Sequence, residues 1–371
     1  MKITIVLGAF LPVPTLMGGA VEKVWFALGK EFARRGHEVV QISRQCCGLP
    51  AEEVIDGVRH LRVPGFDTPP SMLQLKACDL LYSLRARRIL PEADILITNT
   101  FWLPMLVRTK RYGKLYVHVA RYPKGQMRLY SHADRLQTVS RPIMEAIVKE
   151  VPQLENKICY IQLPLPDGIP PLSSAKREKQ ILYVGRVHPE KGIGLLIDAV
   201  ARIPEELFAG WKLVVVGPAE SKFGGGGDAY LEDLKRRAEK ISDRIVWTGA
   251  IFDVAQLDAH YRAASLFVYP SLAEKGETFG LAPLEAMAQG CPAIVSNLRC
   301  FQEFIQPGES GFVFDHRSAD PAQVLAAQIQ ELIGNPERLA QTSVKAHRRA
   351  NDFSLERVAG QYLDDFQTLI S

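Results

Sequence analysis

The stretch PLPDGIPPLSSAKRE, residues 164–178, decides how the chain is divided into domains. It contains four prolines and has little apolar periodicity, which is the composition of a linker. Strand and helix signals alternate before this stretch and start again after it, a pattern typical of a parallel sheet covered by helices. A chain of 371 residues also exceeds what one ordinary hydrophobic core supports. We therefore predict an α/β protein with two doubly wound domains.

The first elements of the two halves follow the same order. An apolar strand at residues 3–7 is followed by a glycine-containing loop and a helix at 20–35, and a strand at 180–184 is followed by a loop and a helix at 193–202. Ligands of such sheets bind beyond the carboxyl ends of the strands, where loops meet helix N-termini. The sequence therefore predicts a binding site in a cleft lined by these loops.

The composition is that of a globular protein. Apolar residues make up 47% of the chain and charged residues 23%. No run of eighteen apolar residues occurs, so we expect no membrane span, and the opening MKITIVLGAF is typical of a buried strand rather than a signal peptide. Six cysteines without CxxC spacing indicate reduced, packed side chains in a cytoplasmic protein. The adjacent pair Cys46 and Cys47 has no evident role in the sequence.

Positive charge is concentrated in the first half of the chain. Residues 1–166 hold 23 Lys and Arg against 14 Asp and Glu, whereas residues 167–371 hold 22 against 27. Basic clusters at 85–88 and 108–111 have two interpretations: solvated helix faces, or a surface for an anionic partner such as a lipid-linked substrate or a membrane. The solvated faces are the first interpretation, and the second would place the first half in peripheral contact with the inner face of an anionic membrane. We expect no nucleic-acid partner.

Three loops contain glycines or cations that are candidates for binding an anion or for making the loop flexible. Gly18 and Gly19 open the helix at 20–35, where glycines let an anion approach backbone amides; a plain turn is the alternative. Arg186 and Lys191 share the loop GRVHPEKG, residues 185–192, so a guanidinium and an ammonium can converge on a diphosphate; ordinary surface charge is the alternative. The glycine run at 224–227 is expected to be a flexible loop at the cleft edge or on the surface; a phosphate cradle is the alternative.

The segment ETFGLAPLE, residues 277–285, places one glutamate on each side of a helix start. Pro283 suits a first helical turn, so Glu277 lies in the loop and Glu285 lies inside the helix. The amides of residues 279–281 are free at the helix N-terminus. The two carboxylates can therefore accept hydrogen bonds from different hydroxyls of one long ligand; solvated charge is the alternative.

Taken together, these residues resemble the family 4 retaining glycosyltransferases of GT-B fold, over nearly the whole chain. The most specific match is the E-x7-E motif of Glu277 and Glu285, and the pair Arg186 and Lys191 and the segments YPS at 269–271 and EAMAQG at 285–290 also match. The resemblance implies two Rossmann-like domains with mainly parallel sheets facing across a cleft. Residues 1–166 would form the acceptor-side domain, 167–178 the hinge and 179–352 the nucleotide-sugar domain, with a helix at 353–371 crossing back to the first domain.

The resemblance also implies roles for individual residues. It gives four catalytic residues: His118, Arg186, Lys191 and Glu277. It gives eight donor-binding residues: Gly18, Gly19, Ala250, Ile251, Phe279, Gly280, Leu281 and Glu285. Among these, Arg186 and Lys191 would hold the diphosphate, Glu277 the hydroxyls of the donor sugar and Glu285 the ribose. The Gly18–Gly19 loop would close on the diphosphate, His118 would lie beside the donor sugar, and the base would rest near Ala250 and Ile251.

The implied reaction is the transfer of a sugar, with retention, from a nucleotide-diphosphate donor to a hydroxyl of a glycan or lipid-linked acceptor. UDP-glucose or another UDP-hexose is the first expectation for the donor, and GDP-mannose is the alternative. No Asp-x-Asp occurs in the sequence, so we expect no metal site and no cofactor, with the charge balanced by cations and helix dipoles. Two other functions stay open: a sugar-nucleotide epimerase of similar architecture, and a non-catalytic nucleotide-sugar-binding protein.

Overall fold

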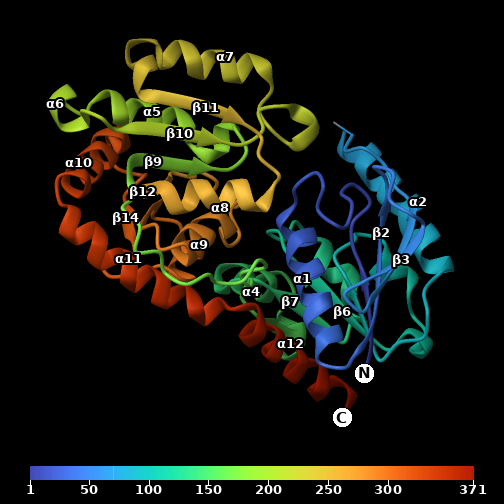
Figure 1. Cartoon of the computed structure of the whole chain (residues 1–371). Coiled ribbons are helices and arrows are strands. Elements are labelled where there is room, and N and C mark those ends of the chain that lie inside the picture. Colours follow the sequence, from blue (N-terminus) through green and yellow to red (C-terminus); the bar gives the residue numbers. More distant parts are fainter. Residues whose placement is uncertain (70) are drawn as a thin grey trace. The chain divides into compact units, whose positions relative to one another are not determined.

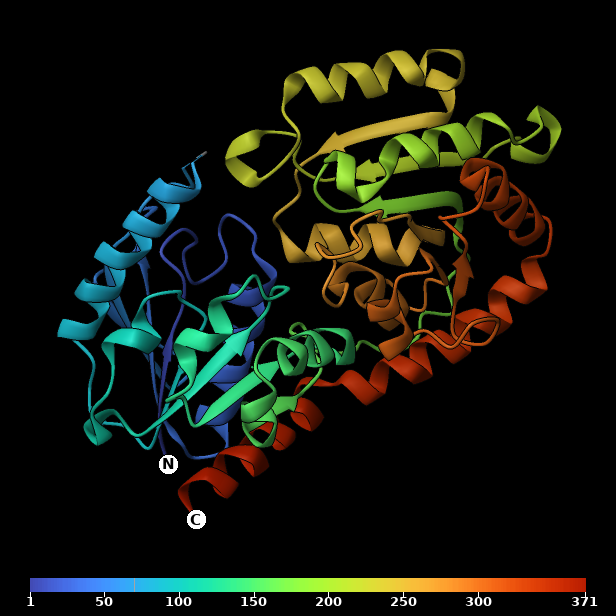
Figure 2. The same ribbon diagram turned by 180° about the vertical axis from the view of Figure 1, so that it is seen from behind.

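The computed structural model describes residues 1–69 and 71–371. The chain divides into two compact units (Figure 1). Unit 1 comprises Met1–Asp167 together with Phe353–Ser371, and unit 2 comprises Gly168–Asp352. Each unit is a β-sheet with helices packed against it, as the views from the front and from behind both show (Figures 1 and 2).

The sheet of unit 1 has eight strands in the order β3-β4-β2-β1-β5-β6-β7-β8. The strands are β1 (Lys2–Val6), β2 (Glu38–Gln45), β3 (Glu52–Ile55), β4 (Val58–Pro64), β5 (Ile95–Thr98), β6 (Lys114–Val119), β7 (Arg135–Thr138) and β8 (Ile158–Tyr160). Neighbouring strands are parallel, except that β3 runs antiparallel to β4. β3 is an edge strand that the sequence pattern did not predict.

The helices of unit 1 are α1 (Ala20–Arg34), α2 (Met72–Arg88), α3 (Leu103–Leu106), α4 (Arg141–Glu150) and α12 (Leu355–Ile370). α12 comes from the end of the chain and packs on α1. Trp25 and Tyr362 meet edge to face at 5.2 Å, and Asp365 accepts a hydrogen bond from the Tyr116 hydroxyl at 2.9 Å and pairs with Arg135 at 2.7 Å. The prediction that the C-terminal helix returns to the first domain is confirmed.

The sheet of unit 2 has six strands, all parallel, in the order β11-β10-β9-β12-β13-β14. The strands are β9 (Glu178–Val184), β10 (Lys212–Val216), β11 (Ile245–Gly249), β12 (Ala264–Tyr269), β13 (Ala293–Ser296) and β14 (Phe312–Phe314). The helices are α5 (Ile193–Ala201), α6 (Glu205–Phe208), α7 (Asp228–Arg237), α8 (Val254–Ala263), α9 (Leu281–Ala288), α10 (Pro321–Ile333) and α11 (Pro336–Ala350). α5 contacts α7 and α10, whereas α9 contacts α8 and α11. The predicted α/β class with two mainly parallel sheets is confirmed.

Two sequence-based expectations about the whole chain can be compared with the structure. Among residues 1–69 and 71–371, no helix is both long enough and apolar enough to cross a membrane. Cys46 and Cys47 are joined by a disulfide, so the expectation that all six cysteines are reduced is wrong for this pair. The side chains of Cys291 and Cys300 are buried and free, in line with a packing role.

Candidate active site

Two loops of unit 2 that follow neighbouring strands form the centre of the predicted site. β9 pairs with β12 in parallel, so the loop at 185–192 and the loop at 270–280 start from the same edge of the sheet. The amide of Leu272 donates to the carbonyl of Glu190 at 2.8 Å. Gly192 leaves no room for a side chain, because a Cβ atom there would lie 2.0 Å from the Pro270 carbonyl oxygen. The two loops are therefore in direct contact.

A buried ion pair joins these loops. Lys191 Nζ lies 2.8 Å from Glu277 Oε2, and the two side chains are only 8% and 9% exposed. The ammonium also lies 5.5 Å from the centre of the Tyr269 ring, which adds a cation–π contact. Burial, together with the charge of Glu277, raises the pKa of the Tyr269 hydroxyl well above its usual value. The loops thus hold one cation and one carboxylate at fixed positions, each of which would be costly to leave unpaired.

Arg186 lies in the same loop as Lys191 but has different partners. Its Nη2 lies 2.7 Å from Glu190 Oε1, and its Nη1 donates to the Gly224 carbonyl at 2.5 Å. The guanidinium side chain is 41% exposed, so it can exchange these partners for an anion at small cost. The amide of Gly226 donates to the backbone of the 185–192 loop. The glycine run at 224–227 is therefore bonded to the predicted site.

The helix α9 starts directly after the second loop. Gly280, with φ of 99°, precedes the first helical residue, and no side chain of the described residues caps this helix end. A Cβ atom on Gly280 would lie 2.5 Å from the Phe301 ring, so this position requires glycine for space as well as for its left-handed backbone. Glu285, in the second turn of α9, accepts a hydrogen bond from the Tyr261 hydroxyl at 3.1 Å. The two glutamates of the E-x7-E motif therefore have different partners.

The remaining residues of unit 2 that were predicted to bind the donor lie at the start of α9 and after β11. The side chain of Phe279 is buried against Phe304, and the next residues, Gly280 and Leu281, form the start of α9, so their amides are the groups that can face a ligand. Ala250 and Ile251 follow the carboxyl end of the edge strand β11.

Phe223 and Phe252 form an aromatic pair near the end of β11 that was not predicted from the sequence. Phe252, which is exposed, meets Phe223 edge to face at 5.3 Å. Phe223 ends the short turn before the glycine run at 224–227, so the pair lies between that run and the segment predicted for the base. An exposed aromatic residue immediately after a parallel strand was the signal that could have indicated it.

The predicted glycine loop of unit 1 lies beside a buried acid. Gly18 and Gly19, with φ of 77° and 110°, connect the loop after β1 to α1. A Cβ atom on Gly19 would lie 2.5 Å from Glu22 Oε2. Burial raises the pKa of Glu22 to about 7, although its own backbone amide and the charge of Arg121 act in the opposite direction. Glu22 was not predicted; an acid in the first turn after a Gly-Gly pair was the available signal.

His118 lies in the interior of unit 1, on β6. Its side chain is 3% exposed, and its Nδ1 lies 2.5 Å from Gln137 Oε1. The imidazole packs edge to face on Trp25 at 5.2 Å, and the buried Nε2 has no hydrogen-bond partner within the described part of the chain. Burial lowers the pKa of His118 to about 4. An enclosed imidazole is not accessible to a substrate. The catalytic role of His118 therefore stays a prediction.

Comparisons with known families and proteins agree with this geometry. A model of glycosyl transferases group 1 matches residues 169–349, and a model of glycosyltransferase family 4 matches residues 17–164. The chain belongs to glycosyltransferase family 4. Both E-x7-E glutamates and both loop cations lie in the first matched range, and the glycine loop and His118 lie in the second.

Individual relatives of this family 4 chain match over about half of its length. The D-inositol 3-phosphate glycosyltransferase of Rhodococcus jostii is 33% identical over 52% of the chain and 40% of the relative. The lipopolysaccharide core biosynthesis mannosyltransferase LpsB of Rhizobium meliloti is 30% identical over 50% of each chain. The chain thus spans about half or less of the length of these curated relatives.

Solved structures match the whole chain and identify the fold. Sucrose-phosphate synthase from Thermosynechococcus elongatus superimposes with a TM-score of 0.80 at 22% identity, over 100% of this chain and 99% of that one. HepE from Anabaena, determined in complex with UDP-glucose, superimposes with a TM-score of 0.74 at 17% identity over 100% of both chains. The fold of the family 4 chain is therefore GT-B.

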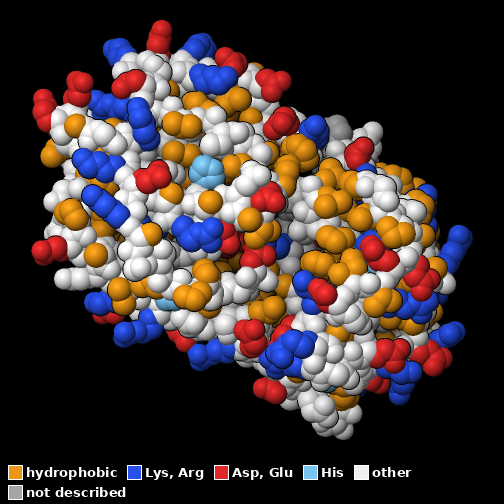
Figure 3. Space-filling view, viewed as in Figure 1, with side chains coloured by type: hydrophobic (Ala, Val, Ile, Leu, Met, Phe, Trp, Pro, Cys, Tyr) orange, Lys and Arg blue, Asp and Glu red, His pale blue; other side chains and the backbone are white. Residues whose placement is uncertain are grey.

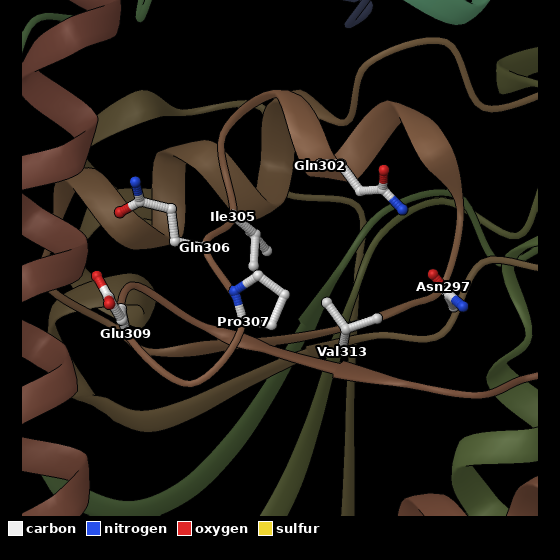
Figure 4. Close-up of a pocket in the computed structure, with 7 residues that line it drawn as sticks. All are labelled: Asn297, Gln302, Ile305, Gln306, Pro307, Glu309 and Val313. Carbon is white, nitrogen blue, oxygen red and sulfur yellow. The ribbon is translucent and has the colours of Figure 1, made fainter.

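A separate hollow lies in unit 2, between residues 297 and 313, with a volume of about 400 Å³. Its side chains include Gln302 and Gln306, which point away from one another (Figure 4). The hollow is lined by none of the predicted site residues that the structure describes. Within residues 1–69 and 71–371, no cluster of three or more His, Cys, Asp or Glu side chains has the arrangement of a metal site.

The buried histidines predict how stability depends on pH. His118 and His60 both have a pKa lowered from 6.5 to about 4 by burial, so the unfolded chain binds their protons at a higher pH than the folded chain. The contribution of these two histidines to the free energy of unfolding is expected to be largest above pH 6.5 and to fall as the pH drops toward 4, whereas Glu22, whose pKa is raised to about 7, contributes in the opposite direction. At about 1.4 kcal/mol per pKa unit, each histidine accounts for roughly 3 kcal/mol of this loss.

The measurement is urea unfolding at several pH values for the wild type and for His118→Gln. The variant is expected to lose a smaller part of its stability between pH 6.5 and pH 4, because its amide does not titrate. If the free energy of unfolding changed with pH by the same amount in the two proteins, the pKa of His118 would be the same in the folded and unfolded states.

Proposed function

We propose that this chain transfers a sugar from a nucleotide-diphosphate donor to a hydroxyl of a glycan or lipid-linked acceptor. The observation that carries the proposal is the buried pair of Lys191 and Glu277 at 2.8 Å, directly before the uncapped start of α9. A fixed cation, a fixed carboxylate and the backbone amides at a helix start are the groups needed to bind a phosphate next to a sugar hydroxyl. Arg186, half-exposed in the same loop, supplies a second cation.

Each group has a separate task in the proposed reaction. Arg186 and Lys191 stabilise the negative charge that grows on the diphosphate as the sugar leaves. Glu277 accepts hydrogen bonds from sugar hydroxyls, and the amides of residues 279–281 donate to the donor between the two glutamates. Glu285, held by the Tyr261 hydroxyl, accepts from the ribose.

We propose the following roles for the predicted residues outside the two loops and the start of α9. Ala250 and Ile251 receive the base of the nucleotide. Gly18 and Gly19 offer backbone amides to the diphosphate. His118 is assigned to the donor sugar, which requires that its enclosed Nε2 becomes accessible when the donor binds.

The proposed donor is UDP-glucose or another UDP-hexose. A protein of the same fold was determined in complex with UDP-glucose, which supports this choice. The alternative is GDP-mannose, which the description of LpsB as a mannosyltransferase favours. A thermal-shift screen of nucleotide sugars distinguishes them, because the true donor is expected to raise the melting temperature most.

The proposed chemistry is retaining and needs no metal ion. The leaving diphosphate takes the proton of the acceptor hydroxyl, and that hydroxyl attacks the face from which the diphosphate departs. The protein contributes positioning and charge stabilisation. Transfer is therefore expected to continue at an unchanged rate in EDTA. An enzyme that loses its activity in EDTA and regains it with magnesium would overturn the metal-free assignment.

Product analysis separates the proposal from its two rivals. A transferase releases nucleoside diphosphate and forms a glycosylated acceptor, and it hydrolyses the donor slowly when no acceptor is present. An epimerase converts the sugar without an acceptor. A binding protein raises its melting temperature with the donor but forms no product with any acceptor or with water.

We also propose that unit 1 lies on the inner face of an anionic membrane through the outer face of α2. Leu73 is 81% exposed, and Leu81 and Leu84 are exposed as well. They lie on the side of the helix opposite the buried Tyr82 and Ala86. In Figure 3, hydrophobic side chains gather on the part of unit 1 where α2, β2 and β3 overlap in the view of Figure 1.

The charges of α2 favour an anionic lipid surface over a neutral partner. Its basic residues are Lys76, Arg85, Arg87 and Arg88. Its single acidic residue, Asp79, is buried and accepts hydrogen bonds from the amides of Phe101 and Trp102 at 3.1 and 3.0 Å. The outer face thus combines exposed leucines with positive charge that no acidic side chain of α2 opposes, and positive charge near an anionic bilayer is attracted to it.

Vesicle sedimentation tests this surface. The wild type is expected to bind vesicles that contain phosphatidylglycerol more strongly than vesicles of phosphatidylcholine alone. Leu73→Ser together with Leu81→Ser should weaken binding about tenfold or more, since two apolar side chains lose their burial in lipid. Leu207→Ser, which changes an exposed leucine of unit 2, is the matched control. Equal binding by all three proteins would rule out α2 as the membrane surface.

A further inference from the structure

The disulfide between Cys46 and Cys47 lies next to the glycine loop of unit 1. The two cysteines follow β2 directly, and β2 is the parallel neighbour of β1, whose following loop leads to Gly18 and Gly19. Cys47 is exposed, and its Sγ lies 4.0 Å from Met17 Sδ. The sulfur pair therefore contacts the residue that precedes the two glycines.

A buried arginine links the cysteine turn to the same loop. The side chain of Arg62 is 0% exposed. Its Nη1 donates to the carbonyl of Pro50 at 2.8 Å, and its Nε and Nη2 donate to the carbonyl of Val13 at 3.1 and 2.9 Å. One guanidinium thus fixes the segment after the cysteines and the segment before the glycines. The same guanidinium also pairs with Glu53 at 2.5 Å, so fixed contacts of one side chain connect the two segments.

The two cysteines lie at the start of a tight turn. The amide of Leu49 donates to the carbonyl of Cys46 at 3.1 Å, which closes a tight turn. Cys47 has φ of 60°, in the left-handed region that residues with a Cβ atom seldom occupy. Gly48, the next residue, also has a positive φ of 76°, and the ring closed by the disulfide adds a covalent constraint to this turn. Without the bond, only the backbone hydrogen bond of the turn remains, and the Cys47 sulfur has more freedom to move away from Met17.

We propose that Cys46 and Cys47 form a redox-active disulfide whose state sets the conformation of the glycine loop at 17–19. The oxidised form holds the loop as described above, and the reduced form releases it. Exposed disulfides are among those most easily reduced, and Cys47 is exposed, which agrees with a switch. The consequence for the donor rests on the proposed function of Gly18 and Gly19, and we expect the reduced protein to bind the donor more weakly.

The reaction partner is a thiol–disulfide couple of low molecular weight or on a protein. The Cys47 thiolate, which is the more exposed, attacks one sulfur of the partner disulfide, whose S–S bond breaks, and the departing thiolate takes a proton. The Cys46 thiolate then attacks the Cys47 sulfur and expels the second partner thiol. Two cysteine thiols lose two electrons and two protons, and the partner disulfide gains them. A dithiol reverses the reaction.

Oxidised and reduced glutathione serve as the partner in the test. The full chain is equilibrated in buffers of different glutathione ratio, and alkylation followed by peptide mass spectrometry measures the fraction of protein with the 46–47 bond. Amide hydrogen exchange is then compared in the two states. Exchange at residues 14–20 is expected to be about threefold or more faster in the reduced protein, with no change in unit 2. Cys46→Ser with Cys47→Ser should match the reduced protein under all conditions, and Cys78→Ser should respond like the wild type.

Two results would overturn the proposal: thiols at 46 and 47 that stay free in oxidised glutathione, or equal exchange at residues 14–20 in the two states. Both measurements, the fraction of protein with the 46–47 bond and the amide exchange at residues 14–20, can be made on the wild type alone. The proposal can therefore be tested even if the double variant folds poorly. Donor binding is measured separately by calorimetry. A redox-dependent loop in a protein that binds no nucleotide sugar would refute the proposed function alone, whereas sugar transfer without a redox-dependent loop would refute the switch alone.

Discussion

Lys191→Ala is expected to lower the turnover number about 10²–10³-fold, the range found when one preorganised group that stabilises developing negative charge is removed. Lys191 is held at 2.8 Å from Glu277 in a nearly water-free position, so its charge acts on the diphosphate with little screening. Donor binding should change less than turnover, since the charge on the diphosphate grows as the sugar leaves. Release of nucleoside diphosphate at saturating and at low donor concentration separates the two effects.

The stability of Lys191→Ala must be measured alongside its activity. The substitution leaves the Glu277 carboxylate buried and unpaired, which costs about 3–5 kcal/mol in typical proteins. Adding Glu277→Gln should restore much of the stability but not the turnover. Lys235→Ala, which breaks an exposed ion pair with Glu232 in unit 2, is the control and should leave both unchanged. A folded Lys191→Ala protein with near wild-type turnover would refute the role of this cation.

Glu285→Ala is expected to weaken binding of the free nucleoside diphosphate by roughly 10- to 150-fold, because hydrogen bonds to a charged group contribute about 1.5–3 kcal/mol. Glu277→Gln should leave this binding nearly unchanged and reduce sugar transfer, because Glu277 is assigned to the sugar. Calorimetry with UDP gives the binding constants.

Tyr261→Phe is the matched control for Glu285. It removes the hydroxyl that donates to Glu285 at 3.1 Å but keeps the carboxylate, so UDP binding should weaken less than in Glu285→Ala. The opposite pattern, with UDP binding lost in Glu277→Gln and kept in Glu285→Ala, would show that the two glutamates have been assigned to the wrong parts of the donor.

The alternation of strands and helices was sufficient to predict the two α/β sheets, because buried parallel strands are continuous apolar runs that are easily recognised. The edge strand β3 was missed. Its sequence EEVI is short and half-exposed, so it lacks the apolar run of a central strand. Pairing with β4, rather than any local preference, makes it a strand.

The candidate site, like the sheets, could be predicted from the sequence only in part. The sequence indicated that Lys191 and Glu277 bind one ligand, but it could not show that they bind each other, because they are 86 residues apart and meet only through the pairing of β9 with β12. The burial of His118 could not be predicted from the sequence either. Its neighbour two residues earlier, Tyr116, lies against Tyr362 and Phe366 of α12, and a helix from the far end of the chain covers that face of the sheet.

Sugar transfer with retention can be tested by following UDP-glucose, labelled with carbon-13 at the anomeric position, by NMR in the presence of the purified protein and no acceptor. We expect slow release of UDP with α-glucose as the first detectable sugar, and a rate that falls in Lys191→Ala. Release of β-glucose first would contradict retention. A donor that stays intact, for UDP-glucose and for every other nucleotide sugar that stabilises the protein, would contradict the assignment as a transferase.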